Sequence, residues 1–372
     1  MPSIRRLLAI SRKEVIQLRR DTRSLVLAFL LPVVLLVLFA YGISWDVNDI
    51  RTVVVDQDRT AASRALTDRF RAAGYFSIRG QPAAAADAIP LIDRGRAQLA
   101  LVIPRGFAAD LAAGRPAPLQ AIVDGSDANT ATMVLGYAQG VVRAFTASLA
   151  GGGRRLAPPV RLESRVWYNE ELVSRNMIVP GLVAVIMMII AAMLTSLTIA
   201  REWERGTMEQ LASTPVHRTE VVLGKLLPYL VIGLGDVLVT TALGVWLFGV
   251  PFRGQLAWLM GASTLFLTGA LGLGLFISAA TKSQLLATQL AMVVTFLPAF
   301  LLSGFMYAID VMPRGLRIAT LLVPARYFVV VTRGVFLKGN GPGVLWVQGL
   351  LMLAFAAIGL LLATRSFRKE IA

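Results

Sequence analysis

The sequence REWERGTMEQLASTPVHRTEVVLGK at residues 201–225 separates two long apolar runs, Val179–Ala200 and Leu226–Val250. Each run is more than 20 residues long and holds at most one ionisable side chain. A helix of that length crosses the ~30 Å hydrocarbon core of a membrane. The stretch between the runs is dense in charge, so we expect it to lie at a membrane face.

The charged stretch carries two signals for local helices. Thr207 and Gln210 have the T-x-x-Q spacing of a capping box, which predicts a short helix that starts at Met208 with Thr207 as its N-cap. Thr214-Pro215 predicts a second start, with the hydroxyl as cap and proline at the first helical position. We expect two short helices with a sharp bend between them. The alternative is a solvated loop whose charges only fix the topology of the neighbouring spans.

The composition indicates a membrane protein. Hydrophobic residues make up 56% of the chain and the mean hydropathy is +0.67, whereas soluble domains are ~45–50% apolar. The formal net charge of +15 is compatible with nucleic-acid binding. However, the basic residues are spread along the chain without zinc-finger spacing, so no nucleic-acid partner is expected. The absence of cysteine excludes disulfides, thiolate metal sites and cysteine nucleophiles, and no metal site is expected.

Residues 1–24 predict a basic amphipathic helix on the cytoplasmic surface of the membrane. Apolar residues recur at helical spacing from Ile4 to Leu18, with basic residues between them. The first predicted span, residues 25–45, follows and is expected to kink at Pro32. Because seven basic residues precede this span, the positive-inside rule places the N-terminus in the cytoplasm and residues 46–178 outside.

Residues 46–178 predict a soluble α/β domain, because short strand-like runs alternate with helical patterns. The predicted strands are 52–55, 76–78, 99–103, 119–123 and 160–168, and the predicted helices are 60–73, 83–98 and 127–150. Acidic clusters follow two of the strands, at Asp56-Gln57-Asp58 and at Asp124-Gly125-Ser126-Asp127. Turns and helix caps at strand ends explain them better than a metal or catalytic site does.

The remainder of the chain, residues 179–372, predicts five further spans at 179–200, 226–250, 256–280, 285–307 and 344–364. The total of six puts both termini on the same side of the membrane, in agreement with the basic C-terminal tail. Residues 308–343 hold apolar runs that are too short to span, such as Phe328–Val331. Such runs enter a membrane only where protein buries them.

Polar residues inside the spans are candidates for a substrate pathway. Asp236 lies eleven residues into the third span and either pairs with a basic group or lines a path for a cationic substrate. Gln289 and Thr295 are milder candidates, for which hydrogen bonds between helices are the other interpretation. The small residues from Gly269 to Gly274 predict a face for close helix packing.

Two segments resemble ABC-2-type exporter permeases. The first matches the family's cytoplasmic loop in about a dozen positions: Glu204-x-Gly206-Thr207-x-Glu209-x-Leu211, Thr214-Pro215, Glu220, Gly224-Lys225 and Pro228-Tyr229. The second matches the segment before the last span: Ser303-Gly304-Phe305, Met312-Pro313, Pro324-x-x-Tyr327, Arg333-Gly334 and Leu337-Lys338-Gly339. The chain departs from the family at Val323, where asparagine is usual.

The resemblance implies that residues 1–24 are a connecting helix and residues 201–225 a coupling region that docks on a separate ATPase subunit. It implies coupling roles for Glu204, Gly206, Thr207, Glu209, Leu211, Pro215 and Lys225. It also implies short re-entrant helices at the outer leaflet in residues 308–343. Family members assemble as homodimers or with a sister permease, and Gram-negative members commonly have a periplasmic membrane-fusion adaptor as a partner.

The chain has no G-x-x-x-x-G-K-[ST] loop, so it is not expected to bind ATP or to be an enzyme; ATP and Mg²⁺ are expected on the partner ATPase, with no cofactor on this chain. We expect an α-helical polytopic membrane protein with six transmembrane helices, ABC-2/type V exporter-like, and an inserted extracytoplasmic α/β domain. The expected function is a permease that exports drugs or other amphipathic molecules across the bacterial inner membrane. The alternatives are a lipid or glycan exporter and a membrane-anchored sensor or assembly scaffold.

Overall fold

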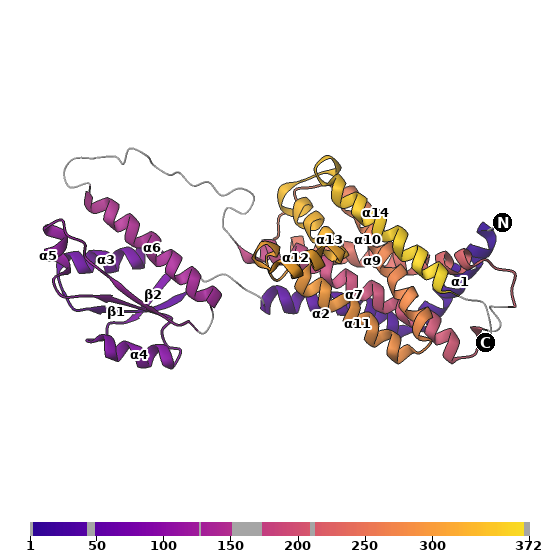
Figure 1. The fold of residues 1–372 in the computed structure, drawn as a ribbon, viewed down its shortest axis with the longest axis horizontal. Coiled ribbons are helices and arrows are strands. Elements are labelled where there is room, and N and C mark those ends of the chain that lie inside the picture. The colour runs from indigo at the N-terminus through magenta and orange to yellow at the C-terminus, as the bar shows by residue number, and fades with distance from the viewer. Residues whose placement is uncertain (1–2, 43–48, 126–127, 151–172, 209–212, 368–372) are drawn as a thin grey trace. The chain divides into compact units, whose positions relative to one another are not determined.

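The computed structural model describes residues 3–42, 49–125, 128–150, 173–208 and 213–367. The chain divides into two compact units (Figure 1). We call Met1–Ser44 together with Val166–Ala372 the membrane unit, and Trp45–Arg165 the α/β unit.

The α/β unit is built on a four-stranded sheet in the order β2-β1-β3-β4. Strand β1 pairs in parallel with β2 and β3, whereas β4 is antiparallel to β3. Its elements in chain order are β1 Ile50–Asp56, α3 Ala61–Ala72, β2 Phe76–Gly80, α4 Ala85–Asp93, β3 Leu99–Ile103, α5 Phe107–Ala112, β4 Gln120–Val123 and α6 Ala128–Ala150. The predicted strand at 160–168 lies outside the described residues.

Helices cover both faces of this sheet (Figure 1). On one face, α3 and α6 pack onto the strands through residues such as Phe70 and Val134. On the other face, Ala88 of α4 packs against Val53 and Val55. The alternating side chains of β1 therefore serve two apolar cores, as expected for a strand in the middle of an α/β sheet.

The acidic cluster after β1 forms a turn, as predicted, but the N-cap of the next helix, α3, is Thr60. Asp56 accepts hydrogen bonds from the backbone N–H of Asp58 and Arg59, at 3.1 and 2.8 Å. Asp58 accepts from the N–H of Gly106 and Ala108, at 2.8 and 3.0 Å. These bonds join the loop after β1 to the loop after β3. In the described residues no group of three His, Cys, Asp or Glu side chains is placed to hold a metal ion.

The membrane unit consists of helices. Its elements are α1 Ile4–Arg20, α2 Thr22–Gly42, α7 Ser174–Glu204, α9 Arg218–Trp246, α10 Leu256–Thr281, α11 Gln284–Leu302, η1 Ile309–Val311, α12 Arg314–Ala319, η2 Thr320–Leu322, α13 Pro324–Arg333, the π-helical η3 Gly334–Lys338 and α14 Pro342–Ser366. Five of them, α7, α9, α10, α11 and α14, are long and apolar enough to cross a membrane.

The first predicted span corresponds to α2, of which Ala28–Gly42 forms a shorter apolar helix. Residues Arg314–Leu322 and Pro324–Lys338 form a bent pair with an angle of 83° between its arms, which is the geometry of a broken span or of a re-entrant loop. The described helices thus give five spans, or six if the bent pair counts as one. The count of six with α2 as the first span stays a prediction.

Helix α7 lies at the centre of the membrane unit. It packs against α2, α9, α10, α11 and α13, and 83% of its most apolar window is buried. The small residues of α10 have the predicted packing role: a Cβ on Gly272 would meet the carbonyl carbon of Gly359 in α14 at 2.6 Å. Close backbone approach of this kind requires glycine on both helices.

The short apolar runs between α11 and α14 are buried by protein, as their length requires. Phe328, Val331 and Phe336 each have no exposed surface. Phe328 stacks on Phe266 of α10 with ring centroids 4.2 Å apart. The second arm of the bent pair, Pro324–Lys338, is therefore packed into the helix bundle, whereas α12 in the first arm has no buried residue.

Candidate functional site

The candidate site lies where α7 ends, where α9 begins and where α1 packs against both. Helix α7 ends at Glu204 in a Schellman motif. The N–H of Gly206 donates to the carbonyl of Trp203 and the N–H of Thr207 donates to that of Glu202, both at 3.1 Å. Gly206 has φ +68°, a left-handed conformation that glycine adopts at little cost. The motif fixes the direction in which the connecting segment leaves the helix.

The Thr207 hydroxyl donates to the Glu202 carbonyl of the preceding helix at 3.4 Å. The residues that it would cap lie outside the described part of the chain, so its role as an N-cap stays a prediction. The second predicted helix start was wrong. Pro215 does not open a helix, because α9 starts at Arg218 and runs unbroken to Trp246. The cap is supplied by Glu220, whose Oε2 accepts the His217 N–H at 2.7 Å. Met208 is helical as predicted, while Glu209, Gln210 and Leu211 lie outside the described residues.

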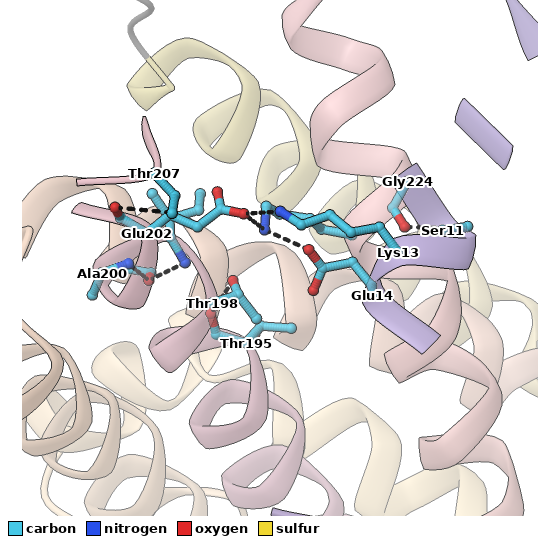
Figure 2. Close-up of polar contacts among 12 residues, drawn as sticks. Ser11, Lys13, Glu14, Thr195, Thr198, Ala200, Glu202, Thr207 and Gly224 are labelled. Carbon is cyan, nitrogen blue, oxygen red and sulfur yellow. Dashed lines mark hydrogen bonds and ion pairs between the residues drawn. The ribbon is translucent and has the colours of Figure 1, made fainter. Parts of the chain in front are cut away.

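Lys225 is buried in an ion-pair cluster. Its Nζ lies 2.7 Å from Glu14 Oε1 of α1 and 3.0 Å from Glu202 Oε1 of α7. Lys13 Nζ lies 2.7 Å from the same Glu202 oxygen (Figure 2). We call Lys13, Glu14, Glu202 and Lys225 the Lys225 cluster. Its two acids and two bases balance, as a buried charge requires.

The cluster ties three helices together, because Lys225 belongs to α9, Glu202 to α7 and Glu14 to α1. The Lys225 side chain is 1% exposed, so it lies in the interior and not on the surface where a direct docking contact would need it. Glu202 Oε2 has no hydrogen-bond partner in the described part of the chain. The cluster is therefore a junction between α1 and the two long helices.

A glycine brings α1 close enough for this junction. A Cβ on Gly224 would lie 2.9 Å from Ile10 Cβ and 3.1 Å from the Leu7 carbonyl oxygen, so α1 crosses α9 directly at this position. The Ser11 hydroxyl donates to the Gly224 carbonyl at 2.9 Å (Figure 2). The buried stripe of α1 is Ile10, Ser11, Glu14 and Leu18.

The start of α1 is also bonded to the segment between α7 and α9. The Ser3 backbone N–H donates to Glu220 Oε1, and the Arg6 guanidinium donates to the Pro215 carbonyl. One turn below the Schellman motif, Arg201 pairs with Asp21 at 3.0 Å. Helix α1 is thus attached to the connecting segment, to α7 and to α9.

Glu204 is exposed but engaged. Its carboxylate accepts the Gln284 backbone N–H at 2.7 Å and also the Gln284 side-chain amide. Gln284 is the first residue of α11, so Glu204 places an anion at the N-terminus of that helix. Glu204, Gly206, Thr207, Pro215 and Lys225 are therefore brought into one region, whereas the structural surroundings of Glu209 and Leu211 stay undescribed.

The three intramembrane candidates lie in different surroundings. Asp236 is 1% exposed in α9, and its Oδ2 has no hydrogen-bond partner among the described residues. Thr295 is buried, but its hydroxyl donates to the Ala291 carbonyl of its own helix at 2.6 Å and not to another helix. Gln289 is exposed. A shared pathway lined by all three stays a prediction.

Sequence reasoning missed Glu14, Glu202 and Arg333. Glu14 could have been found, because it stands in the stripe at positions 10, 14 and 18 where a helix buries apolar residues. Arg333 joins three segments, since its guanidinium donates to the carbonyls of Met177, Gly304 and Phe305 at 3.2, 3.0 and 3.2 Å. It sits in the matched Arg333-Gly334 pair, but nothing in the local pattern indicated these partners.

The comparisons with known proteins agree in one family. Residues 23–365 match the family described as ABC-2 family transporter protein. The "Probable multidrug ABC transporter permease YbhS" of Escherichia coli K12 is 40% identical over 358 residues, which cover 96% of this chain and 95% of that relative. "Probable multidrug ABC transporter permease YbhR" of the same organism is 30% identical and covers 98% and 99%. "Linearmycin resistance permease protein LnrN" of Bacillus subtilis is 25% identical and covers 95% and 97%.

Proposed function

The chain belongs to the ABC-2 family of transporter proteins, and on that basis we propose that it is the permease subunit of an exporter whose ATP is hydrolysed on a separate chain. The multi-pass membrane character follows from the family and from the apolar helices. Two similar relatives carry "multidrug" in their names. We extend that description to this chain as the export of amphipathic drug-like molecules from the cytoplasm, by a dimer of permease chains.

The observation that carries the proposal is the Lys225 cluster. A permease without a nucleotide site must be moved by a separate ATPase. That movement can be transmitted only through a rigid region of the permease. The described connections meet that need, because α1 and the segment after α7 are joined to each other and to α9. A displacement of this assembly moves α1, α7 and α9 together.

The motion would then spread through α7. This helix carries Glu202 at one end and packs along its length against five other helices. At its other end, Met177 accepts from Arg333 of the bent pair. A push at the Glu202 end therefore reaches the segment around Arg333 along one continuous 31-residue helix.

In this proposal the end of the membrane unit that holds the Lys225 cluster is cytoplasmic, and the α/β unit is extracytoplasmic. The chain has no cysteine, so single cysteines can be introduced without further change. Cysteine at Ser77 of β2 should react with an impermeant thiol reagent in cells with a permeabilised outer membrane. Cysteine at Ser366, at the end of α14, should react only after lysis; the reverse pattern would refute this orientation.

The transport proposal is tested by purification and reconstitution. The full chain, tagged and extracted from native membranes, should co-purify with a chain that carries a G-x-x-x-x-G-K-[ST] loop. The complex in inside-out vesicles should accumulate an amphipathic dye such as ethidium only when ATP is added, and the permease alone should not hydrolyse ATP. Hydrolysis by the permease alone, or a complex that moves no amphipathic dye, would overturn the proposal.

A further inference from the structure

A basic recess lies beside the Lys225 cluster, between α1 and the end of α7. Its volume is about 610 Å³, and its lining includes Lys13, Gln17, Arg20, Arg201 and Arg205 together with one acid, Asp21. A second hollow of about 290 Å³ shares four of these residues and extends to Thr207. The two form one depression, which we call the basic recess. We infer that it binds the phosphate headgroup of an anionic membrane lipid.

The charge of the recess calls for an anion. Lys13 and Arg201 each have an acidic partner, Glu202 and Asp21 respectively. Arg20 and Arg205 make no ion pair among the described residues. Two guanidinium groups without a carboxylate partner line one recess, and guanidinium groups bind phosphate oxygens through two parallel hydrogen bonds.

The position of the recess on α1 favours a lipid over a soluble anion. Lys13, Ile16, Gln17 and Arg20 follow one another at helical spacing and so share one face of α1. Ile16 lines the recess and is 44% exposed, so an apolar side chain lies beside the cationic groups. This combination is what an amphipathic helix presents to the boundary between headgroups and acyl chains.

An apolar surface continues from the recess. Gln284 of α11 stands at its rim, and the next two residues, Leu285 and Leu286, are 68% and 51% exposed. The Gln284 backbone N–H and its side-chain amide both donate to Glu204. A phosphate among the arginines therefore has room for its acyl chains along α11. A glycerophospholipid with a net negative charge supplies both the phosphate for the arginines and the acyl chains for the apolar surface of α11.

The inference rests on the proposed function only for the placement of α1 at the cytoplasmic surface, and the lipid titration that tests it needs neither ATPase nor transport. The full chain is purified in detergent and titrated with phosphatidylglycerol or phosphatidylcholine, and bound lipids are counted by native mass spectrometry. We expect one tight site for phosphatidylglycerol. The variant Arg20→Gln/Arg205→Gln should bind it about thirtyfold more weakly, at about 1 kcal/mol for each basic residue.

The matched control is Arg5→Gln/Arg365→Gln, which removes two exposed arginines outside the recess. It should change the affinity less than threefold, because the tight site needs local geometry and not net charge alone. Equal losses in the two variants, equal binding of the two lipids, or equally tight binding of soluble glycerol 3-phosphate would each overturn the inference. If the recess variant keeps its lipid affinity but no longer co-purifies with the ATPase, the occupant is an acidic protein segment instead.

Discussion

The membrane unit and the α/β unit place their charged side chains differently. Among the described residues, the buried charged side chains are Glu14, Glu202, Glu220, Lys225 and Asp236, and all five belong to the membrane unit. In the α/β unit the buried cores are apolar, and Asp56 and Asp58 serve turns at the ends of strands. Charge organises local loops in one unit and joins distant helices in the other.

The same contrast recurs inside the membrane unit. Lys225 is surrounded by acids from two other helices, whereas Asp236, eleven residues further along α9, is buried without an ion-pair partner in the described chain. A paired buried charge is explained by structure. An unpaired one keeps a cost that a protein tolerates at a functional site. Each of the following predictions tests one side of this contrast.

The largest expected effect comes from removing the cation of the paired site. Lys225→Met leaves Glu14 and Glu202 buried without their shared partner, and breaking a buried ion pair from one side costs about 3–5 kcal/mol. The midpoint temperature of thermal unfolding, measured on the purified chain, should therefore lie well below that of the wild type. The triple variant Glu14→Gln/Lys225→Met/Glu202→Gln should recover most of that loss, because no buried charge is left unpaired.

The control for this experiment is Lys282→Met. Lys282 is exposed and its Nζ lies 4.3 Å from the centroid of the Trp203 ring, so its loss should cost about 1 kcal/mol or less. A triple variant as unstable as Lys225→Met would show that the packing of these side chains, and not their charge, holds the helices together.

The second effect has the opposite sign and concerns the unpaired site. Asp236→Leu removes a buried carboxylate from α9, and insertion scales assign at least about 2.5 kcal/mol to a central aspartate. We expect a gain in stability of about 2 kcal/mol together with a loss of ATP-driven transport. Ser263→Ala is the control, since that hydroxyl only donates to the Leu259 carbonyl of its own helix. Wild-type transport by Asp236→Leu would make this acid a tolerated residue without a role in the pathway.

The third effect is local to the turn that ends α7. Gly206→Ala places a side chain at φ +68°, which costs about 1 kcal/mol although the space around it is open. Hydrogen exchange of the Thr207 amide should become about fivefold faster because its bond to Glu202 opens more often. Gly261→Ala, inside α10 with equally open space, should leave that rate unchanged. If the two variants show the same exchange rate, the Schellman turn does not control how often the Thr207 amide opens.

The smallest effect is in the α/β unit and depends on pH. The Asp58 carboxylate accepts hydrogen bonds from the Thr60 hydroxyl and from backbone N–H groups, and these bonds lower its pKa below the ordinary 3.8. A lowered folded pKa contributes stability that is complete above the unfolded value and is lost as the pH falls through the folded value. Asp58→Asn should therefore flatten the acid dependence of hydrogen exchange in β1 and β3 of the full chain below pH 3.8.

The exposed Asp93 offers the matching control, because Asp93→Asn removes one carboxylate from the same unit without touching these bonds. If both variants flatten the acid dependence equally, the net charge of the unit and not the Asp58 hydrogen bonds governs it.

Most of the helices and strands were predictable from the sequence, because they depend on local patterns. The predicted spans 256–280 and 344–364 match α10 and α14 to within two residues. The four strands that fall on described residues were found at their β-branched or apolar runs. One short helix, α5, was not predicted. The other errors lie at helix ends: α7 starts at Ser174 and α9 at Arg218, since polar first turns extend helices beyond the apolar runs that revealed them.

The site was less predictable, because its contacts join residues far apart in the chain. The sequence places Lys225 in a charged stretch at a membrane face, and the resemblance implies a role for it in coupling to the ATPase. The burial of Lys225 depends on Glu14, which is 211 residues away. No periodicity in the sequence pairs these two positions. The Thr214-Pro215 dipeptide predicts a helix start, but the Pro215 carbonyl accepts from Arg6 of α1, which is 209 residues away.

The wide separation of Glu14 and Lys225 sets the order in which the protein can be assembled during its synthesis. At about 5–20 residues per second, a ribosome that has made Glu14 needs about 10–40 s to reach Lys225. Over that interval α1 has no α9 to pack against. During this time α1, with Glu14, can lie at the membrane surface, where a basic amphipathic helix is stable by itself.

Lys225 then meets carboxylates that were made before it. Glu202 precedes it by only 23 residues, about 1–5 s of synthesis. When Lys225 is synthesised, Glu202 has therefore just been made, whereas Glu14 was made much earlier. Closing the cluster can only be a late step of biogenesis, so a nascent chain that stops before residue 225 should leave α1 accessible to protease.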